Sequence, residues 1–64
     1  MENEVTNLLN NMAEQFQSAM NDAEKFTSGN NSAGTRVRKA MQNIKNLAQQ
    51  VRIEVQEQKN SVTA

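Results

Sequence analysis

Four basic side chains recur at seven-residue intervals in the second half of the sequence. They are Arg38, Lys45, Arg52 and Lys59, and we call them the basic row. On an α-helix a seven-residue repeat drifts by only ~20° per step, so these cations share one side of the helix. Successive charges lie ~10.5 Å apart along the helix axis, and the row spans ~31 Å. Evenly spaced cations on a rigid rod can neutralise the phosphates of a polyanion without reading its sequence.

Further candidate residues lie where this segment begins. Arg36 and Lys39 add two cations on other sides of the same helix. The preceding loop, GNNSAG, places backbone amides at a helix N-terminus, which favours an anion, although it lacks the GxxxxGK[ST] spacing of a P-loop. The candidate phosphate-binding residues are therefore Arg36, Arg38, Lys39, Lys45, Arg52 and Lys59, with Gly29, Asn30 and Gly34 at the loop and helix start.

The residue types that perform most enzyme chemistry are missing from the chain. Its 64 residues include no Cys, His, Pro, Trp or Tyr. This removes disulfides, thiolate and imidazole metal ligands, and the side chain used most often for proton transfer near neutral pH. So short a chain can scarcely enclose a dry pocket around the remaining Ser, Thr and carboxylates. We expect no enzyme activity, no cofactor, no metal and no small-molecule substrate.

Charge is segregated along the chain, although its net charge is zero. Residues 1–28 carry one lysine against five carboxylates, a net charge of −4, and residues 29–64 carry six cations against two carboxylates, a net charge of +4. The basic half favours an anionic partner. No apolar run approaches the ~18 residues that cross a bilayer, and the acidic start MENE lacks the positive region of a secretory signal. We therefore expect a cytoplasmic protein that has no membrane partner.

Apolar residues alternate at spacings of three and four in two segments, which predicts two amphipathic helices. The first stripe is Val5, Leu9, Met12, Phe16, Ala19, Ala23 and Phe26, broadened by Leu8 and Met20. The second is Val37, Met41, Ile44, Ala48, Val51 and Val55, broadened by Ala40 and Leu47. We expect helices over about residues 3–28 and 31–60, joined by a turn near residues 28–32. Gly29 suits the left-handed residue after a helix, and Asn30, Asn31 or Ser32 can cap the next one.

The predicted fold class is all-α, a single antiparallel helical hairpin. Two helices shield only one side of each other, and chains below ~70 residues usually need a further stabilising device. Self-association can supply it, so we expect a homodimer that forms a four-helix bundle or a coiled-coil-like assembly. Gly34 costs up to about 1 kcal/mol relative to Ala in a helix, and it permits a close approach by the first helix, a partner chain or a phosphate. The sequence does not choose among these.

The basic row also has a purely structural interpretation, in which it pairs with acids of a neighbouring helix. The positions that flank the first stripe are Thr6, Ala13 and Met20 on one side and Leu8, Gln15 and Asp22 on the other. Among them only Asp22 is a carboxylate, so most of the row lacks an acidic partner within the hairpin. A solvated basic surface without any ligand is the remaining alternative.

The stretch GNNSAGTRVRKAMQNIKNLAQQVRIE, residues 29–54, resembles the small linker-histone-like nucleoid proteins of chlamydiae, other bacteria and phages. The resemblance rests on a Gly-Asn pair, small residues, a Gly and an Arg-x-Arg opening the second helix. These are Gly29, Asn30, Ala33, Gly34, Arg36 and Arg38. It implies a nucleoid-associated, self-associating helical hairpin that binds double-stranded DNA and compacts it. This chain lacks the long Lys- and Ala-rich tail of the chlamydial members and has Asn31 at a position where the family has Lys. We therefore expect modest, salt-sensitive affinity.

Two functions thus stay open at the level of the sequence. One is a small histone-like protein that binds DNA phosphates without sequence preference. The other is a self-associating helical-bundle module that docks protein partners and binds no nucleic acid.

Overall fold

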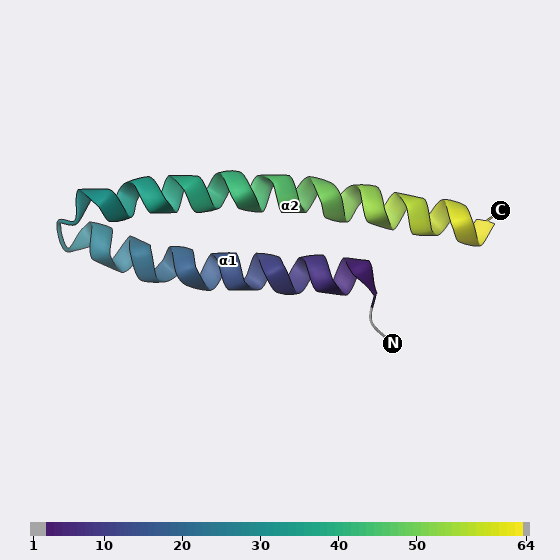
Figure 1. Cartoon of the computed structure of the whole chain (residues 1–64), viewed down its shortest axis with the longest axis horizontal. Coiled ribbons are helices and arrows are strands. Elements are labelled where there is room, and N and C mark those ends of the chain that lie inside the picture. The colour runs from purple at the N-terminus through teal and green to yellow at the C-terminus, as the bar shows by residue number, and fades with distance from the viewer. Residues whose placement is uncertain (1–2, 64) are drawn as a thin grey trace.

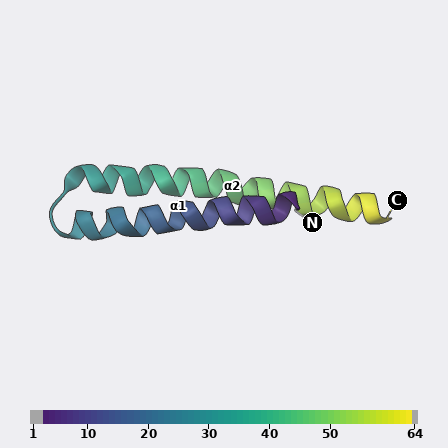
Figure 2. The ribbon, with the colours of Figure 1, turned by 60° about the horizontal axis from the view of Figure 1, so that its bottom comes forward.

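The computed structural model describes residues 3–63, with side chains through residue 60. Two helices, α1 (Glu4–Thr27) and α2 (Asn31–Thr63), run antiparallel and side by side in a hairpin of 54 × 20 × 10 Å (Figure 1). No strand occurs in this range, and the predicted all-α helical hairpin is confirmed. The longer α2 extends past the start of α1 at the open end, as both views show (Figure 2).

Residues 28–30 form a turn that closes one helix and opens the next. Gly29 has a φ of 106°, as expected for the residue after a helix end. The Asn30 amide donates to the Lys25 carbonyl over 3.0 Å and the Gly29 amide to the Phe26 carbonyl over 2.9 Å, the two bonds of a Schellman motif. Asn30 then caps α2, because its Oδ1 accepts from the Ala33 amide over 3.2 Å.

A reciprocal pair of side-chain amides links the two helices at the open end. Asn3 Nδ2 donates to Gln58 Oε1 over 3.2 Å, and Gln58 Nε2 donates to Asn3 Oδ1 over 3.0 Å. Asn3 Oδ1 also accepts from the Val5 amide over 2.8 Å, which caps α1. The start of α1 therefore lies level with residue 58 of α2.

Alanines and larger aliphatic side chains share the contact between the helices. The buried apolar residues are Leu8, Ala19, Ala33, Ala40 and Ile44. On α1 Val5, Met12 and Ala19 of the predicted stripe are covered, and the other covered positions are Leu8, Gln15 and Asp22 in place of Leu9, Phe16 and Ala23. Alanines at the contact let the two helix backbones approach closely, Leu8 and Ile44 fill the space between the helices, and Phe16, Met20 and Met41 stay outside the contact.

The uncovered half of the apolar stripes forms one side of the hairpin. Ala23 and Phe26 of α1 line a shallow hollow together with Gly34 and Val37 of α2, so these positions share a side. Residues seven positions apart lie on the same side of a helix, so this side can be followed along α1 and α2 in steps of seven residues. We call it the apolar face; it comprises Leu9, Phe16, Ala23, Phe26, Gly34, Met41, Ala48 and Val55, with Met20 at its α1 edge. As expected for two helices that shield only one side of each other, each hairpin covers only part of its own apolar surface.

The opposite side of the hairpin is polar. Asn11 and Gln15 of α1 line a second hollow with Asn43 and Gln50 of α2. Ile53 is exposed and lies away from the apolar face, which agrees with its position opposite the predicted stripe. The two broad sides of the hairpin therefore differ sharply in chemistry.

Candidate functional site

The basic row follows the outer edge of α2 next to the apolar face. Arg38 lines the same hollow as Phe26, Gly34 and Val37, which places the row on that side of the helix. All four members of the row are exposed. Because α2 is continuous from Asn31 to Thr63, the charges are held on a straight rod at the spacing expected from their seven-residue repeat.

Three members of the row have no counter-ion in the part of the chain that the structure describes. Among the residues that the structure describes, Arg38, Lys45 and Arg52 make no ion pair and no side-chain hydrogen bond. The carboxylates of α1 lie elsewhere, since Glu4, Glu14 and Glu24 do not occupy positions facing this edge. The structural interpretation, in which the row pairs with acids of the neighbouring helix, is therefore not realised within one chain at these three positions.

The one carboxylate that the sequence placed beside α2 bonds to a different cation. Arg36 Nε donates to Asp22 Oδ1 over 3.0 Å, and Asp22 is largely shielded while Arg36 stays half exposed. This pair lies on the polar side of the hairpin, because Arg36 precedes Asn43 and Gln50 by seven and fourteen residues on α2. Arg36 is thus separated from the basic row.

Lys39 also lies apart from the row. It follows Arg38 by one residue, which rotates it by 100° around α2, and it shares an edge with Asn46 and Ile53. Of the six cations predicted to bind phosphate, the structure therefore brings four together, namely Arg38, Lys45, Arg52 and Lys59.

The glycines and asparagine at the loop have structural roles in the hairpin. Gly29 and Asn30 close the turn. Gly34 receives the aromatic ring of Phe26: a Cβ on Gly34 would lie 2.7 Å from Phe26 Cδ1 and 2.8 Å from Cε1. The close approach that Gly34 permits is therefore made by a side chain of α1.

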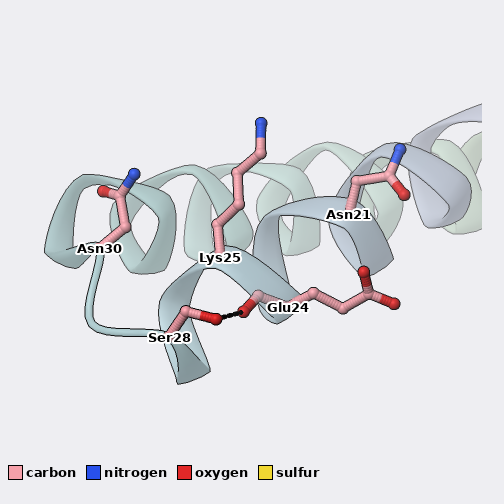
Figure 3. A pocket seen from close by; sticks show the side chains of 5 residues that line it. All are labelled: Asn21, Glu24, Lys25, Ser28 and Asn30. Carbon is pink, nitrogen blue, oxygen red and sulfur yellow. Dashed lines mark hydrogen bonds between the residues drawn. The ribbon is translucent and has the colours of Figure 1, made fainter.

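A wide hollow beside the turn has mixed charge. Asn21, Glu24, Lys25, Ser28 and Asn30 line it, and their side chains point in different directions (Figure 3). The Ser28 hydroxyl donates to the Glu24 backbone carbonyl over 3.0 Å. Because a carboxylate and an ammonium group both border this hollow, it offers no concentrated charge for an anion or a cation.

Other kinds of site are not found in the described range. Residues 3–63 hold no group of three acidic, His or Cys side chains arranged for a metal ion. Neither helix, as far as it is described, combines the length and the hydropathy that a bilayer span requires.

Sequence reasoning found the basic row and expected one side of the helices to stay uncovered, but it did not identify which apolar residues lie on that side. Leu8 and Leu9 are adjacent, so the apolar stripe of the first segment was wide enough to face two partners. The width of this stripe was the feature of the sequence that could have indicated an uncovered apolar surface. Leu9, Phe16 and Met41 are exposed large apolar side chains in the structure, and they make the apolar face a second candidate interaction surface.

Comparison with known proteins adds one finding. A family model described as "Histone H1-like protein Hc1" matches residues 6–61, which is most of the chain. No curated protein matches the chain, and no solved structure does.

Proposed function

Because the chain belongs to the histone H1-like protein Hc1 family, we propose that it is a small nucleoid-associated protein that binds double-stranded DNA through its phosphates. In this proposal the protein acts in the cytoplasm, associates with itself and helps to compact or organise DNA. It needs no catalytic residue, cofactor or metal for this function.

The observation that carries the proposal is the basic row. Arg38, Lys45 and Arg52 stand on one exposed edge without a carboxylate partner among the described residues. Flexible cations held ~10.5 Å apart on a helix can follow a phosphate backbone. The row spans ~31 Å, close to the ~34 Å of one turn of B-DNA. One edge therefore fits about one helical turn of a duplex.

The same residues favour binding without sequence preference. Contacts to phosphates position a protein on DNA and carry no base information. The two aromatic side chains are Phe16, which lies on the apolar face, and Phe26, whose ring packs against Gly34. Phe26 lies near Arg38 in one hollow, but neither aromatic side chain continues beside Lys45 and Arg52, so stacking on successive bases does not contribute in this proposal.

Salt dependence gives the proposal a numerical test. Three or four phosphate contacts per chain imply a slope of roughly −3 to −4 in a plot of log affinity against log salt concentration. The measurement is a titration of a short DNA duplex at several salt concentrations, on protein of known oligomeric state. A slope near zero would contradict phosphate binding by the row.

A matched pair of variants assigns the contacts. Arg38→Gln with Arg52→Gln removes two charges from the row, and we expect the slope to become shallower by about 2. Arg36→Gln with Lys39→Gln removes the same charge from α2 outside the row, and we expect a change below about 1. Circular dichroism confirms that both variants stay helical. Equal losses for the two variants would show that net charge, rather than the row, determines binding.

The open apolar face favours a second candidate, a self-associating bundle that docks other proteins. Leu9, Phe16 and Met41 are all at least two-fifths exposed, which is typical of an interaction surface. This candidate predicts self-association together with no retardation of duplex DNA in a gel. The titration above therefore separates the two functions.

A further inference from the structure

The hollow that Phe26, Gly34 and Arg38 line lies at the end of the basic row nearest the turn. We propose that it binds one unpaired nucleotide at the end of a DNA strand, with the base on the ring of Phe26 and the adjoining phosphate on Arg38. The paired part of the same DNA then lies along Lys45 and Arg52. The chain therefore prefers a duplex with an overhanging nucleotide to a blunt one. This inference rests on the proposed function, because it extends the same phosphate-binding surface.

An exposed aromatic ring is the feature of this hollow that suits a base. One edge of the Phe26 ring packs on Gly34, where a Cβ would lie 2.7 Å from Cδ1 and 2.8 Å from Cε1, yet Phe26 is 51% exposed. Ala23 and Val37 complete the apolar part of the lining. Every base has a π-face, so a ring held in this way can stack on any of the four. The hollow has a volume of about 400 Å³, within the ~300–1,000 Å³ of sites for small ligands.

Three polar side chains line the same hollow. Asn31, Thr35 and Arg38 follow one another at spacings of four and three residues, which puts them on one side of α2. None of the three makes a side-chain hydrogen bond or an ion pair with another described residue. The Asn31 amide and the Thr35 hydroxyl can both donate and accept, so they can bond to the edge of any base. The guanidinium of Arg38 matches a phosphate.

The position of the hollow decides which part of a DNA strand can reach it. Lys45 and Arg52 follow Arg38 in steps of ~10.5 Å away from the turn, whereas the hollow extends from Arg38 toward the turn past Thr35 and Asn31. A strand that lies along the basic row therefore reaches the hollow only with the part that continues beyond Arg38. Because Arg38 alone among the row borders the hollow, one base enters it and the other cations meet phosphates.

The base must be unpaired to stack on Phe26. Bases inside a duplex are stacked and paired, and extruding one of them costs free energy. A nucleotide in an overhang has no complement to leave, so it can turn onto the ring at a lower cost. The ligand is therefore the end of a strand that extends past its duplex, and a blunt end leaves the ring unused.

Fluorescence of 2-aminopurine, an analogue of adenine, tests the site. One duplex carries a single overhanging 2-aminopurine nucleotide, and a second carries an abasic overhang with the same phosphates. Both duplexes offer the same charge to the basic row, so a difference in affinity comes from the base. We expect the wild-type chain to quench the fluorescence by stacking and to bind the overhang with the base about fivefold or more tightly.

Matched substitutions separate stacking from apolar packing. Phe26→Leu keeps a large apolar side chain without the ring, and we expect it to lose the preference for the base, whereas Phe26→Tyr retains the ring and the preference. Phe16→Leu makes the same change at a phenylalanine that is 47% exposed and lies outside the hollow, so it should leave the preference intact. Circular dichroism confirms that the variants stay helical. Equal losses for Phe16→Leu and Phe26→Leu would overturn the assignment to this hollow.

The outcomes distinguish this inference from the proposed function. Equal affinity for the two overhangs would overturn the inference, and the proposed function would stand if both duplexes still bind with the salt dependence given above. A chain that binds neither duplex would refute the proposed function and this inference together. Free 2-aminopurine deoxynucleoside monophosphate is the third arm of the experiment. If it is quenched as strongly as the overhang at equal concentration, the hollow binds free nucleotides, and its assignment to a strand end is wrong.

Discussion

The contact between Phe26 and Gly34 yields a prediction whose sign depends on the background. Gly34→Ala adds a Cβ that would lie 2.7 Å from Phe26 Cδ1 and 2.8 Å from Cε1, far inside normal carbon–carbon contact. The ring must therefore move off α2, or the helices must separate. Alanine also favours the helix relative to glycine by up to about 1 kcal/mol. The added Cβ therefore destabilises the hairpin through its contact with the ring and stabilises the helix through the preference of alanine for it.

The magnitudes follow from these distances. Forcing an extra methyl group into an occupied position typically costs about 1–3 kcal/mol. After the helical gain of up to about 1 kcal/mol is subtracted, Gly34→Ala should lower the free energy of unfolding by roughly 0–2 kcal/mol. In a Phe26→Ala background the ring is absent, and the same substitution should raise it by roughly 0.5–1 kcal/mol. The coupling between the two sites is then about 1 kcal/mol or more.

The assay is a double-mutant cycle measured by urea denaturation, followed by circular dichroism at one protein concentration. A fixed concentration matters because self-association contributes to the apparent stability. If Gly34→Ala stabilises the chain equally with and without Phe26, the ring does not occupy the position over Gly34. The explanation of this glycine would then be refuted.

Further predictions concern the turn and the two exposed surfaces. Asn30→Ala removes the cap of α2 and should cost about 1 kcal/mol of unfolding free energy in thermal denaturation. A Cβ added by Gly29→Ala would contact no neighbouring atom, so the loss of roughly 1–2 kcal/mol of unfolding free energy comes from the φ of 106°. This loss should be equal in the monomer and in any assembly. Phe16→Glu should abolish self-association in sedimentation equilibrium, whereas Ile53→Glu should leave it unchanged. The two side chains are matched in exposure, at 47% and 48%. Equal effects of the two substitutions would therefore show that the apolar face is not the surface of self-association.

Much of the fold was predictable because the local signals agree. The three-and-four spacing of apolar residues indicates helices, and the Gly29–Asn30 pair marks the reversal, since both residues suit a helix end followed by a cap. The alignment of the basic row was equally predictable, because residues seven positions apart lie on nearly the same side of any continuous helix.

The exact contact between the helices was not predictable from spacing. Leu8 and Leu9 are equally apolar, and a stripe that includes both can turn either one toward α2. The structure buries Leu8 and exposes Leu9, and the alanines of α2 that face α1 favour close packing of the backbones. The role of Gly34 was unpredictable for a similar reason, because its neighbour Phe26 reaches it only after the register is set.

The amides of Asn3 and Gln58 at the open end of the hairpin have a consequence for how the molecule responds to its surroundings. Both groups are neutral, so these bonds between the two helices neither titrate between acid and alkaline pH nor weaken when ions screen charges. The proposed binding to a polyanion is instead ionic, and it weakens as the concentration of dissolved ions rises. If the chain binds DNA as we propose, a rise in ion concentration should therefore release it from the duplex while the hairpin stays folded, so that it can bind again without refolding.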